Sequence, residues 1–382
     1  MPWNMSVGLH SAGCEINNVL LDCTPANLRP SILPRVAGKP SLRRAAKSFR
    51  RLSRMFLPDR SHRSRLKEMR SFAEIASRKV QAGRFDLVVA ANMSGLVAMI
   101  ETSLPIIYVT DATATLANAM YPSFAERRKG ERDVAAEFET LAADRADLVL
   151  VASEYCRSSM CRDHGADSSK VHVVPLGANL VPNPDLDSDH AFEDRSVPTD
   201  GGEIELVVVA ADPERKRVGL CAAVAETLED RGWRARLHYI GPRHPICDHR
   251  LVEWAGRLDH DVASDRARHC DVLRRAHLAI LPSASEMFGI APIESAAFGR
   301  PSIVSAVGGL TTVVQDGVTG RCLPVDTPVS GWADAVESMV VPADRYRAYA
   351  DAALRRYQEE LNWEAWGHRV KGFARGLVGA DP

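Results

Sequence analysis

The stretch that decides the fold is LPSASEMFGIAPIESAAFGRP, which runs from Leu281 to Pro301. It starts at the end of an apolar run that is typical of a strand covered on both faces. A polar loop carrying Glu286 follows, and a helix is predicted from near Gly289 to Gly299. A glycine is a natural C-terminal stop for a helix, and the proline after it leads into the next strand. Strand, loop, helix and strand in this order indicate a parallel α/β sheet.

The same alternation extends along the whole chain in both directions. Short β-branched runs predict strands at Ile16–Asp22, Asp86–Ala90, Ile106–Thr110, Leu148–Ala152, Val171–Val174, Ile204–Ala210, Arg236–Gly241, Leu278–Leu281 and Pro301–Ser305. Helical patterns lie between them, at Arg65–Gln81, Glu131–Asp144, Val218–Arg231, Ser264–Arg275 and Phe288–Phe298, and in a helical tail over Trp332–Leu377.

The layout predicts two α/β domains, and 382 residues are enough for two hydrophobic cores. We expect an N-terminal domain over residues 1–180, a linker rich in Pro, Asp, Ser and Gly over 181–203, and a second domain over 204–345. The remaining residues, 346–382, are predicted to be helical. Two halves of similar layout indicate doubly wound, Rossmann-like domains that face a cleft.

The front of the first domain departs from this layout. A Rossmann-like half normally opens with a strand and a glycine-bearing turn, whereas this chain reaches helix-like sequence at once, beginning Pro2-Trp3-Asn4. The strand at Ile16–Asp22 would then be the second of its sheet. Either the true start lies upstream, or the domain lacks its first strand and its first phosphate-facing loop.

Composition and charge exclude several classes of protein. The chain has 48 Lys and Arg against 49 Asp and Glu, which argues against a dedicated nucleic-acid binder. No apolar stretch is long enough for a membrane span, and the start lacks the features of a secretory signal. Eight scattered cysteines include no CxxC pair and no zinc-ligand spacing, so we expect reduced thiols, a cytoplasmic protein and no bound metal.

The quoted stretch also predicts a ligand site. A helix N-terminus at the carboxyl end of a parallel strand offers free backbone N–H groups to a diphosphate, and Gly289 would let that ligand approach the backbone closely. Glu286 lies just before this helix and Glu294 in its second turn. Carboxylates are poor partners for phosphate and better acceptors for sugar hydroxyls, so the pair indicates a ligand that carries both groups.

The ordered motifs resemble a known family. Glu286-x7-Glu294 lies within Pro-Ser-x-x-Glu-x-Phe-Gly and Glu-Ser-Ala-Ala-x-Gly-x-Pro, followed by Gly308-Gly309 and Asp-Gly-x-Thr-Gly ending at Gly320. This series is similar to that of the retaining nucleotide-sugar glycosyltransferases of family 4, which have the GT-B fold. Corresponding landmarks lie further upstream, in Ser153-Glu154-Tyr155, in the run from Val171 to Asn179, and in Asp212-Pro-Glu-Arg-Lys.

The resemblance implies an activity: transfer of a hexose-type sugar from a nucleotide-diphosphate donor to a hydroxyl of a glycan, a lipid or a small natural product, with retention and without a metal ion. It implies that Glu286 holds hydroxyls of the transferred sugar and that Glu294 holds the ribose diol. Arg215 and Lys216, expected at the start of the first helix of the second domain, would neutralise the departing diphosphate. Further donor contacts are implied for Phe288, Gly289 and Ile290.

Two further features follow from the resemblance. Many relatives have Gly-Arg where this chain has Ala210-Ala211, and Arg215 is the candidate to supply the missing guanidinium group. The C-terminal helix that contains Trp363 and Trp366 is expected to cross back to the first domain, as it does in relatives.

The acceptor side has fewer signals. Asp111 follows the strand Ile106–Thr110, at the edge where open α/β sheets present ligand-contacting groups, and relatives often have a histidine near this point. It is a candidate for orienting the acceptor or the sugar. The alternative is that Asp111 is the N-cap of the next helix. Ser153 and Glu154 leave the same choice between a cap and a cleft-facing role.

One region is strongly basic. Apolar residues recur at helical spacing within residues 41–57, among six Lys and Arg residues that few acids oppose, so a basic amphipathic helix is predicted there. It either touches an anionic membrane surface, which would make the protein peripheral to the inner membrane face, or packs on the core with a solvated basic face.

The sequence leaves two alternative functions open. Another GT-B activity, such as a sugar-nucleotide epimerase or a phosphorylase, would lack the Glu286-x7-Glu294 context. A non-catalytic protein that binds a sugar nucleotide or a partner is suggested by the missing first strand and glycine loop.

Overall fold

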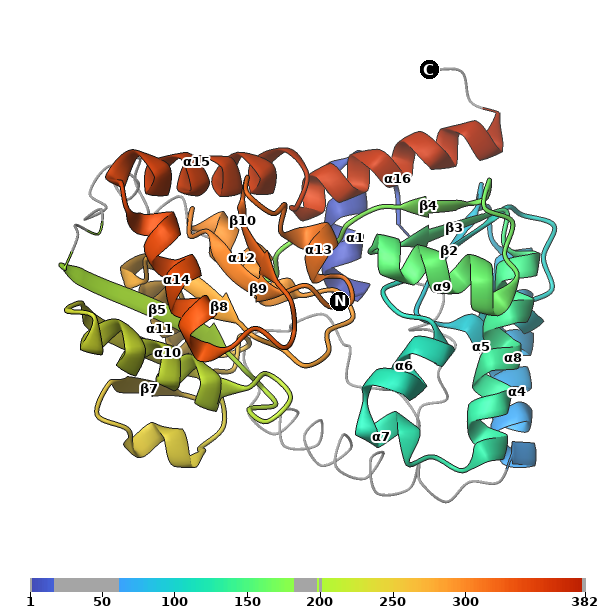
Figure 1. Cartoon of the computed structure of the whole chain (residues 1–382). Helices are drawn as coiled ribbons and strands as arrows, with labels where there is room; N and C mark the ends of the chain where they lie inside the picture. Colours follow the sequence, from blue (N-terminus) through green and yellow to red (C-terminus); the bar gives the residue numbers. More distant parts are fainter. Residues whose placement is uncertain (1, 17–61, 182–197, 199–200, 380–382) are drawn as a thin grey trace. The chain divides into compact units, whose positions relative to one another are not determined.

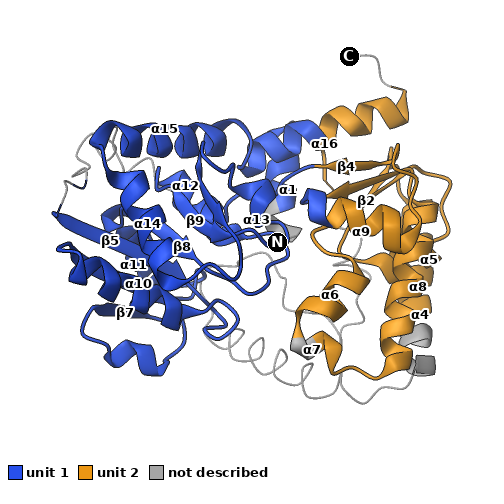
Figure 2. Cartoon of the chain, viewed as in Figure 1, with its two compact units in different colours: residues 1–12, 152–155, 174–369 blue, residues 13–151, 156–173, 370–382 orange. Residues whose placement is uncertain are grey.

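The computed structural model describes residues 2–16, 62–181, 198 and 201–379. The chain forms two compact units, each built on a parallel sheet with helices around it (Figure 1, Figure 2). Unit 1 comprises residues 1–12, 152–155 and 174–369, and unit 2 comprises residues 13–151, 156–173 and 370–382. The predicted α/β class with two parallel-sheet domains is confirmed, and neither unit is continuous in sequence.

Unit 2 contains a four-stranded parallel sheet in the order β1-β2-β3-β4. The strands are β1 (Val88–Ala91), β2 (Ile106–Thr110), β3 (Leu148–Val151) and β4 (Val171–Val173). The helices around them are α4 (His62–Ala82), α5 (Ser94–Met99), α6 (Ala114–Met120), α7 (Pro122–Ala125), α8 (Lys129–Arg145) and α9 (Glu154–His164). Every residue of β2 is buried, as its continuous apolar run predicts.

Unit 1 contains a six-stranded parallel sheet in the order β10-β9-β8-β5-β6-β7. The strands are β5 (Glu203–Val209), β6 (Arg234–Ile240), β7 (Val252–Gly256), β8 (Leu278–Leu281), β9 (Ser302–Ser305) and β10 (Gly320–Leu323). The helices are α1 (Pro2–Ser11), α10 (Val218–Asp230), α11 (Ala263–Arg275), α12 (Ile290–Ala297), α13 (Leu310–Val313), α14 (Val329–Val340), α15 (Ala343–Glu359) and the first part of α16 (Trp363–Val378), with a short 3-10 turn at Pro245–Asp248. Residues 370–378 of α16 belong to unit 2.

The predicted elements of the described residues are present, and two strands were not predicted. Strands β2 and β8 have the predicted bounds, and the other predicted strands are shifted by one or two residues at one or both ends. The strands β7 and β10 were missed. Of the strand predicted at Ile16–Asp22, only Ile16 is described, and it is not in a strand; residues 17–22 and the predicted basic helix at 41–57 lie outside the described residues.

Helix α1 packs closely on α16 within unit 1. A Cβ atom added to Gly8 would collide with the carbonyl oxygen of Trp363, and one added to Gly367 would collide with the carbonyl oxygen of Gly8. Two helix backbones can approach this closely only where neither carries a side chain at the contact. The glycines therefore set the distance between the first and the last helix of unit 1.

Among the described helices, none is both long and apolar enough to cross a bilayer.

Candidate functional site

The candidate site lies at the carboxyl ends of β5 and β8, two neighbouring strands of the sheet in unit 1. The chain leaves β5 toward α10 on one route and β8 toward α12 on another, so the strand order changes direction at this point. Ligands of open α/β sheets bind at such a switch point. The two loops are joined there by a hydrogen bond from the Ala284 N–H to the Arg215 carbonyl, 2.8 Å long.

Three charged side chains meet between these loops. The Arg215 Nη1 atom donates to Glu286 Oε2 at 3.1 Å and to the Ser285 carbonyl at 2.5 Å. The Lys216 Nζ atom lies 3.7 Å from the same Glu286 oxygen and donates to the Val209 carbonyl at 3.2 Å. The structure thus brings together the two predicted cations and the predicted sugar-binding carboxylate.

These charges are largely removed from water. The exposed fractions of the side chains are 15% for Arg215, 13% for Lys216 and 10% for Glu286. Burial lowers the pKa of Lys216, and the neighbouring Glu286 opposes that shift. In such a site, a fixed cation interacts with a ligand charge more strongly than it would at an exposed surface.

The basic pair lies in a turn and not in the helix, which corrects its expected place at the helix start. Helix α10 begins at Val218, and its N-cap, Arg217, has a left-handed backbone with φ 51°. The turn is closed by Asp212, whose Oδ1 accepts from the Arg215 N–H at 3.1 Å. Because the turn precedes the helix, both cationic side chains lie at the strand end, close to β8.

Helix α12 starts where the sequence predicted. Its N-cap is Gly289, with φ 102°, a conformation that L-residues rarely adopt. A Cβ atom on Gly289 would lie 2.5 Å from Leu310 Cδ2. The glycine is therefore required by its backbone conformation and by the packing of α13, whatever a ligand needs. Phe288 is buried, and Ile290 is the first residue of the helix.

Glu294 lies in the second turn of α12 and is only 4% exposed. Burial raises its pKa to about 8, while Lys216 and the backbone N–H groups of Asn179 and Leu180 favour the ionised form. A solvated glutamate on the helix face is thereby excluded. In the free protein, this carboxyl group connects α12 to the segment that follows β4.

Asp111 lies in unit 2, directly after β2, and Asn92 follows the neighbouring strand β1. Burial raises the pKa of Asp111, and a hydrogen bond from the Asn92 side chain opposes this shift. Asn92 has a left-handed backbone with φ 54°. The N-cap of α6 is Thr113, whose Oγ1 accepts from the Leu116 N–H at 3.2 Å, so the capping alternative for Asp111 is wrong.

Ser153 directly precedes α9 and is fully buried, whereas the backbone N–H of Glu154 donates to Thr312 Oγ1 at 3.2 Å. This hydrogen bond holds the start of α9 against α13 within unit 1.

Two buried carboxylates of α8, Glu131 and Glu139, were missed from the sequence, and Glu139 is the more deeply buried. Glu139, in α8, is 4% exposed, and its Oε1 accepts from the Tyr108 hydroxyl at 2.8 Å. Its burial could have been predicted from its helical spacing. Glu139 lies four residues after Ala135 and four before Ala143, so it is on the helix face directed toward the core and not on the solvated face.

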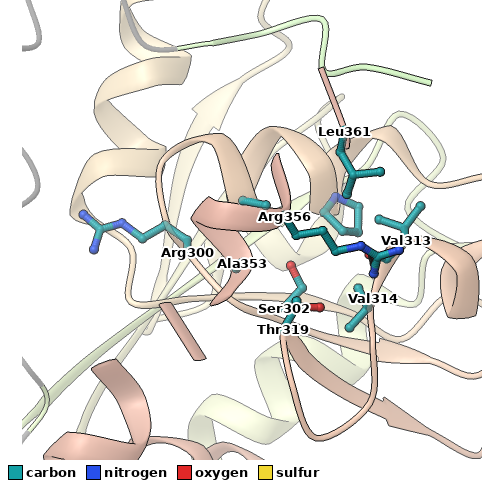
Figure 3. Close-up of a pocket in the computed structure, with 10 residues that line it drawn as sticks. Arg300, Ser302, Val313, Val314, Thr319, Ala353, Arg356 and Leu361 are labelled. Atoms are coloured by element: carbon teal, nitrogen blue, oxygen red, sulfur yellow. Dashed lines mark hydrogen bonds between the residues drawn. The ribbon is translucent and has the colours of Figure 1, made fainter. Parts of the chain in front are cut away.

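Unit 1 also has a small pocket (Figure 3), and Arg215, Lys216 and Glu286 are not among its lining residues. Two of its lining residues, Pro292 and Ala296, come from α12, and two are arginines. Arg356 donates to the carbonyls of Val313 and Thr312 at 2.8 and 2.6 Å, and Arg300 to those of Leu273 and Arg274. Because backbone carbonyls occupy these guanidinium groups, the pocket is a packing feature that supports α12 and α13.

Across the described parts of the chain, no group of three or more His, Cys, Asp and Glu side chains could hold a metal ion. The seven cysteines that lie there are free thiols. Burial raises the thiol pKa of Cys156 and Cys221 well above its ordinary value, so neither is a reactive thiolate.

Comparison with known proteins gives matches in both halves. The family model described as Glycosyltransferase Family 4 matches residues 6–181, and the one described as Glycosyl transferases group 1 matches residues 203–341. A D-inositol 3-phosphate glycosyltransferase of Kineococcus radiotolerans is 32% identical over 299 residues, which is 70% of this chain and 66% of the relative. The protein of the same name from Rhodococcus erythropolis is also 32% identical, over 65% of this chain and 56% of the relative. The match thus spans somewhat less than two thirds of these relatives.

Solved structures show the same fold. A sucrose-phosphate synthase from Thermosynechococcus elongatus superposes with a TM-score of 0.61 at 20% identity, over 83% of this chain and 79% of that one. An Anabaena protein solved in complex with UDP and glucose superposes with a TM-score of 0.56 at 15% identity, over 80% and 81%.

Proposed function

We propose a reaction for this chain, which belongs to glycosyltransferase family 4 and has the GT-B fold. It moves a hexose-type sugar from a nucleotide-diphosphate donor to a hydroxyl acceptor, with retention of anomeric configuration. The observation that carries this proposal is the cluster of Arg215, Lys216 and Glu286 at the switch point of unit 1. It combines the two chemistries that a sugar diphosphate requires.

The cations act on the leaving group. Departure of a nucleoside diphosphate from the anomeric carbon builds negative charge on the diphosphate oxygens, and preorganised cations stabilise that charge in the transition state. Arg215 offers a planar fork and Lys216 a point charge, both at the end of β5. The N-terminus of α12 adds backbone N–H groups at the end of β8.

The carboxylates act on hydroxyls. Glu286 would accept hydrogen bonds from the transferred sugar and Glu294 from the ribose diol. The backbone N–H groups of Asn179 and Leu180 contact the Glu294 carboxyl group. Its proposed role therefore requires that the ribose hydroxyls also reach this group. Phe288, Gly289 and Ile290 would line the donor. Asp111 would orient the acceptor or the sugar from the end of β2.

The names of the relatives indicate which class of acceptor to test first. The curated relatives are named for D-inositol 3-phosphate, a phosphorylated cyclitol with several free hydroxyls. We infer that a small polyol phosphate is the acceptor to test first, ahead of glycans and lipids.

The first experiment identifies the donor. A thermal-shift screen with UDP-, GDP- and ADP-sugars should give a higher Tm with one base, because a ligand that binds only the folded state stabilises it. That donor is then incubated with D-inositol 3-phosphate, free inositol and other hydroxyl acceptors, and the product is identified by mass spectrometry. Tight donor binding with neither transfer nor hydrolysis would favour the non-catalytic sugar-nucleotide-binding protein.

Variants of the basic pair test the site. Arg215→Ala and Lys216→Ala should each lower kcat/KM by about 10- to 1,000-fold, the range for loss of one preorganised donor. Arg347→Ala is the matched control, because Arg347 is 59% exposed and pairs only with exposed Asp344 among the contacts described for it. Unchanged donor affinity and turnover in Arg215→Ala would show that Arg215 does not supply the guanidinium group.

Two remaining expectations belong to the same proposal. We expect transfer to persist in EDTA, since the charge is neutralised by side chains. We also place the enzyme in the cytoplasm, with peripheral contact to anionic membrane through residues 41–57. Flotation with anionic liposomes tests this contact, and a protein that stays at the bottom of the gradient would rule it out.

A further inference from the structure

Glu139 is a buried carboxylate that the proposed chemistry does not use. It lies in α8 of unit 2 (Figure 1). Its carboxylate is hydrogen-bonded to groups of three other elements of that unit, β2, α5 and α6. The Tyr108 hydroxyl of β2 donates to Glu139 Oε1 at 2.8 Å. The Ser94 side chain, at the first residue of α5, and the backbone N–H of Ala114, at the first residue of α6, complete its hydrogen bonds.

These partners lie on both sides of Asp111. Glu139 contacts Tyr108 and Ala114, and residues 109–113 lie between them: the last two residues of β2, which ends at Thr110, and the loop 111–113 before α6. The opposite side of this loop is held as well, by Asn92 on Asp111 and by a 2.7 Å hydrogen bond between Thr113 Oγ1 and Ser159 Oγ.

A carboxylate in this buried space costs more folding free energy than an apolar side chain would. A buried charge costs free energy even when it is well hydrogen-bonded, and an apolar side chain of similar volume is often at least as stable. What an apolar side chain cannot do is accept from a hydroxyl, a second hydroxyl and a backbone N–H at once. The carboxylate therefore fixes the positions of the groups around the loop and does not increase the stability of the fold.

We infer that Glu139 is a positioning residue of the acceptor side, whose carboxylate holds loop 111–113, and with it the Asp111 side chain, through Tyr108, Ser94 and Ala114. The inference rests on the proposed function in one respect, that Asp111 meets the acceptor or the sugar.

Hydrogen exchange tests the contact itself, without any activity. In Glu139→Gln, the amide oxygen has two lone pairs for three donors, so amides 112–116 should exchange about 10-fold faster than in the wild type. Glu137→Gln, an exposed residue of the same helix, is the matched control and should leave this exchange unchanged. Equal protection in Glu139→Gln and the wild type would overturn the inference.

A second variant keeps the test open should Glu139→Gln fail to fold. Tyr108→Phe removes one donor and leaves the carboxylate and the ring in place. It should accelerate exchange of the same amides several-fold, and unchanged exchange there would equally overturn the inference.

Kinetics then separate positioning from a merely structural role. Glu139→Gln should raise the KM for the acceptor and lower kcat by about 10-fold each, while donor affinity stays within twofold of the wild type. A uniform loss of folded protein would instead lower the rate without changing either KM. If the wild type transfers nothing, the proposed function falls, and the exchange experiment still decides the role of Glu139.

The pH profile gives a further signature. Burial raises the pKa of Glu139 to about 7, and the ionised form is the one that can accept three hydrogen bonds, so wild-type transfer should rise through pH 7. The titratable groups that face Glu139 are Tyr108 from β2 and Cys156 from α9, and burial raises the pKa of both well beyond this range. The rise should be absent in Glu139→Gln. Its persistence there would assign it to another group and contradict the inference.

Discussion

Glu286 has two cationic neighbours, and both are the groups proposed to bind the diphosphate. Its carboxylate lies 3.1 Å from Arg215 and 3.7 Å from Lys216. On the proposed function, an incoming diphosphate would compete with this internal counter-ion for the same two cations. Glu286 would become available to a sugar hydroxyl as the phosphate oxygens took over its partners.

Replacement of Glu286 should separate binding from transfer. In Glu286→Gln the cations lose their charged partner, so a nucleoside diphosphate without a sugar should bind about 3- to 10-fold tighter, as expected for about 1 kcal/mol of released pairing. Sugar transfer should fall by about 100-fold or more. Calorimetric titration measures the first effect and product formation the second.

The control for this variant is Glu214→Gln, since Glu214 is 88% exposed and precedes Arg215 in the turn before α10. It should leave both quantities near the wild-type values. Weaker diphosphate binding in Glu286→Gln would contradict the counter-ion competition.

Glu294 should make folding stability depend on pH. Its pKa is raised from 4.5 to about 8, so the folded protein retains a proton that the unfolded chain releases above pH 4.5. The unfolded state then binds fewer protons, and the free energy of unfolding falls as the pH rises from 5 to 8. Relative to Glu294→Gln, the wild type should lose on the order of 4 kcal/mol over that range. Urea unfolding at several pH values measures the difference, and parallel curves for the two proteins would refute it.

At the scale of elements, the start of α12 depends on one backbone conformation. Gly289→Ala forces a Cβ into a left-handed position, 2.5 Å from Leu310 Cδ2. We expect a loss of about 2–4 kcal/mol in the free energy of unfolding, from strain and overpacking together. Gly219→Ala, in α10, is the control, because nothing lies within 4 Å of its added Cβ. That change should be neutral or stabilising by up to about 1 kcal/mol, and chemical denaturation of both variants tests the contrast.

The strands that the sequence did not reveal are the two outer ones. Strands β7 and β10 lie at the two edges of the six-stranded sheet. Neither has a continuous apolar run: β7 reads Val-Glu-Trp-Ala-Gly and β10 reads Gly-Arg-Cys-Leu. The inner strands β8 and β9 are buried on both faces and are almost wholly apolar, or small, in consequence. All four inner strands of this sheet were predicted from the sequence, and both of its edge strands were missed.

Proximity in the site was predictable only where a motif supplied it. The meeting of Arg215, Lys216 and Glu286 was implied by the family resemblance, which assigns all three to one donor site. The contact of Glu294 with the N–H groups of Asn179 and Leu180 joins segments more than 100 residues apart, and no local pattern marks it. A glutamate that is buried in a helix looks, in sequence, like one that is solvated.

At the scale of the whole molecule, the first helix is part of the same unit as residues 174–369. Gly367→Ala should push α1 away from α16, because the new Cβ would meet the Gly8 carbonyl. We expect a loss of about 1–3 kcal/mol, seen as a lower Tm. Gly372→Ala lies in the same helix with nothing within 4 Å of its added Cβ, so it should leave the Tm unchanged or raise it. Equal effects of the two substitutions would show that the close contact contributes nothing.

The same contact has a consequence for the order of events on the ribosome. Helix α1 is made before its partner α16, which follows roughly 350 residues later. At about 5–20 residues per second, that interval is roughly 20–70 s. Throughout it, the side of α1 that carries Gly8 has no native surface to pack on. Unit 2, by contrast, can pair all four of its described strands once residue 173 has been made. Unit 1 thus reaches its final packing only after α16 has been made, so it is the unit more exposed to misfolding when translation stops before α16.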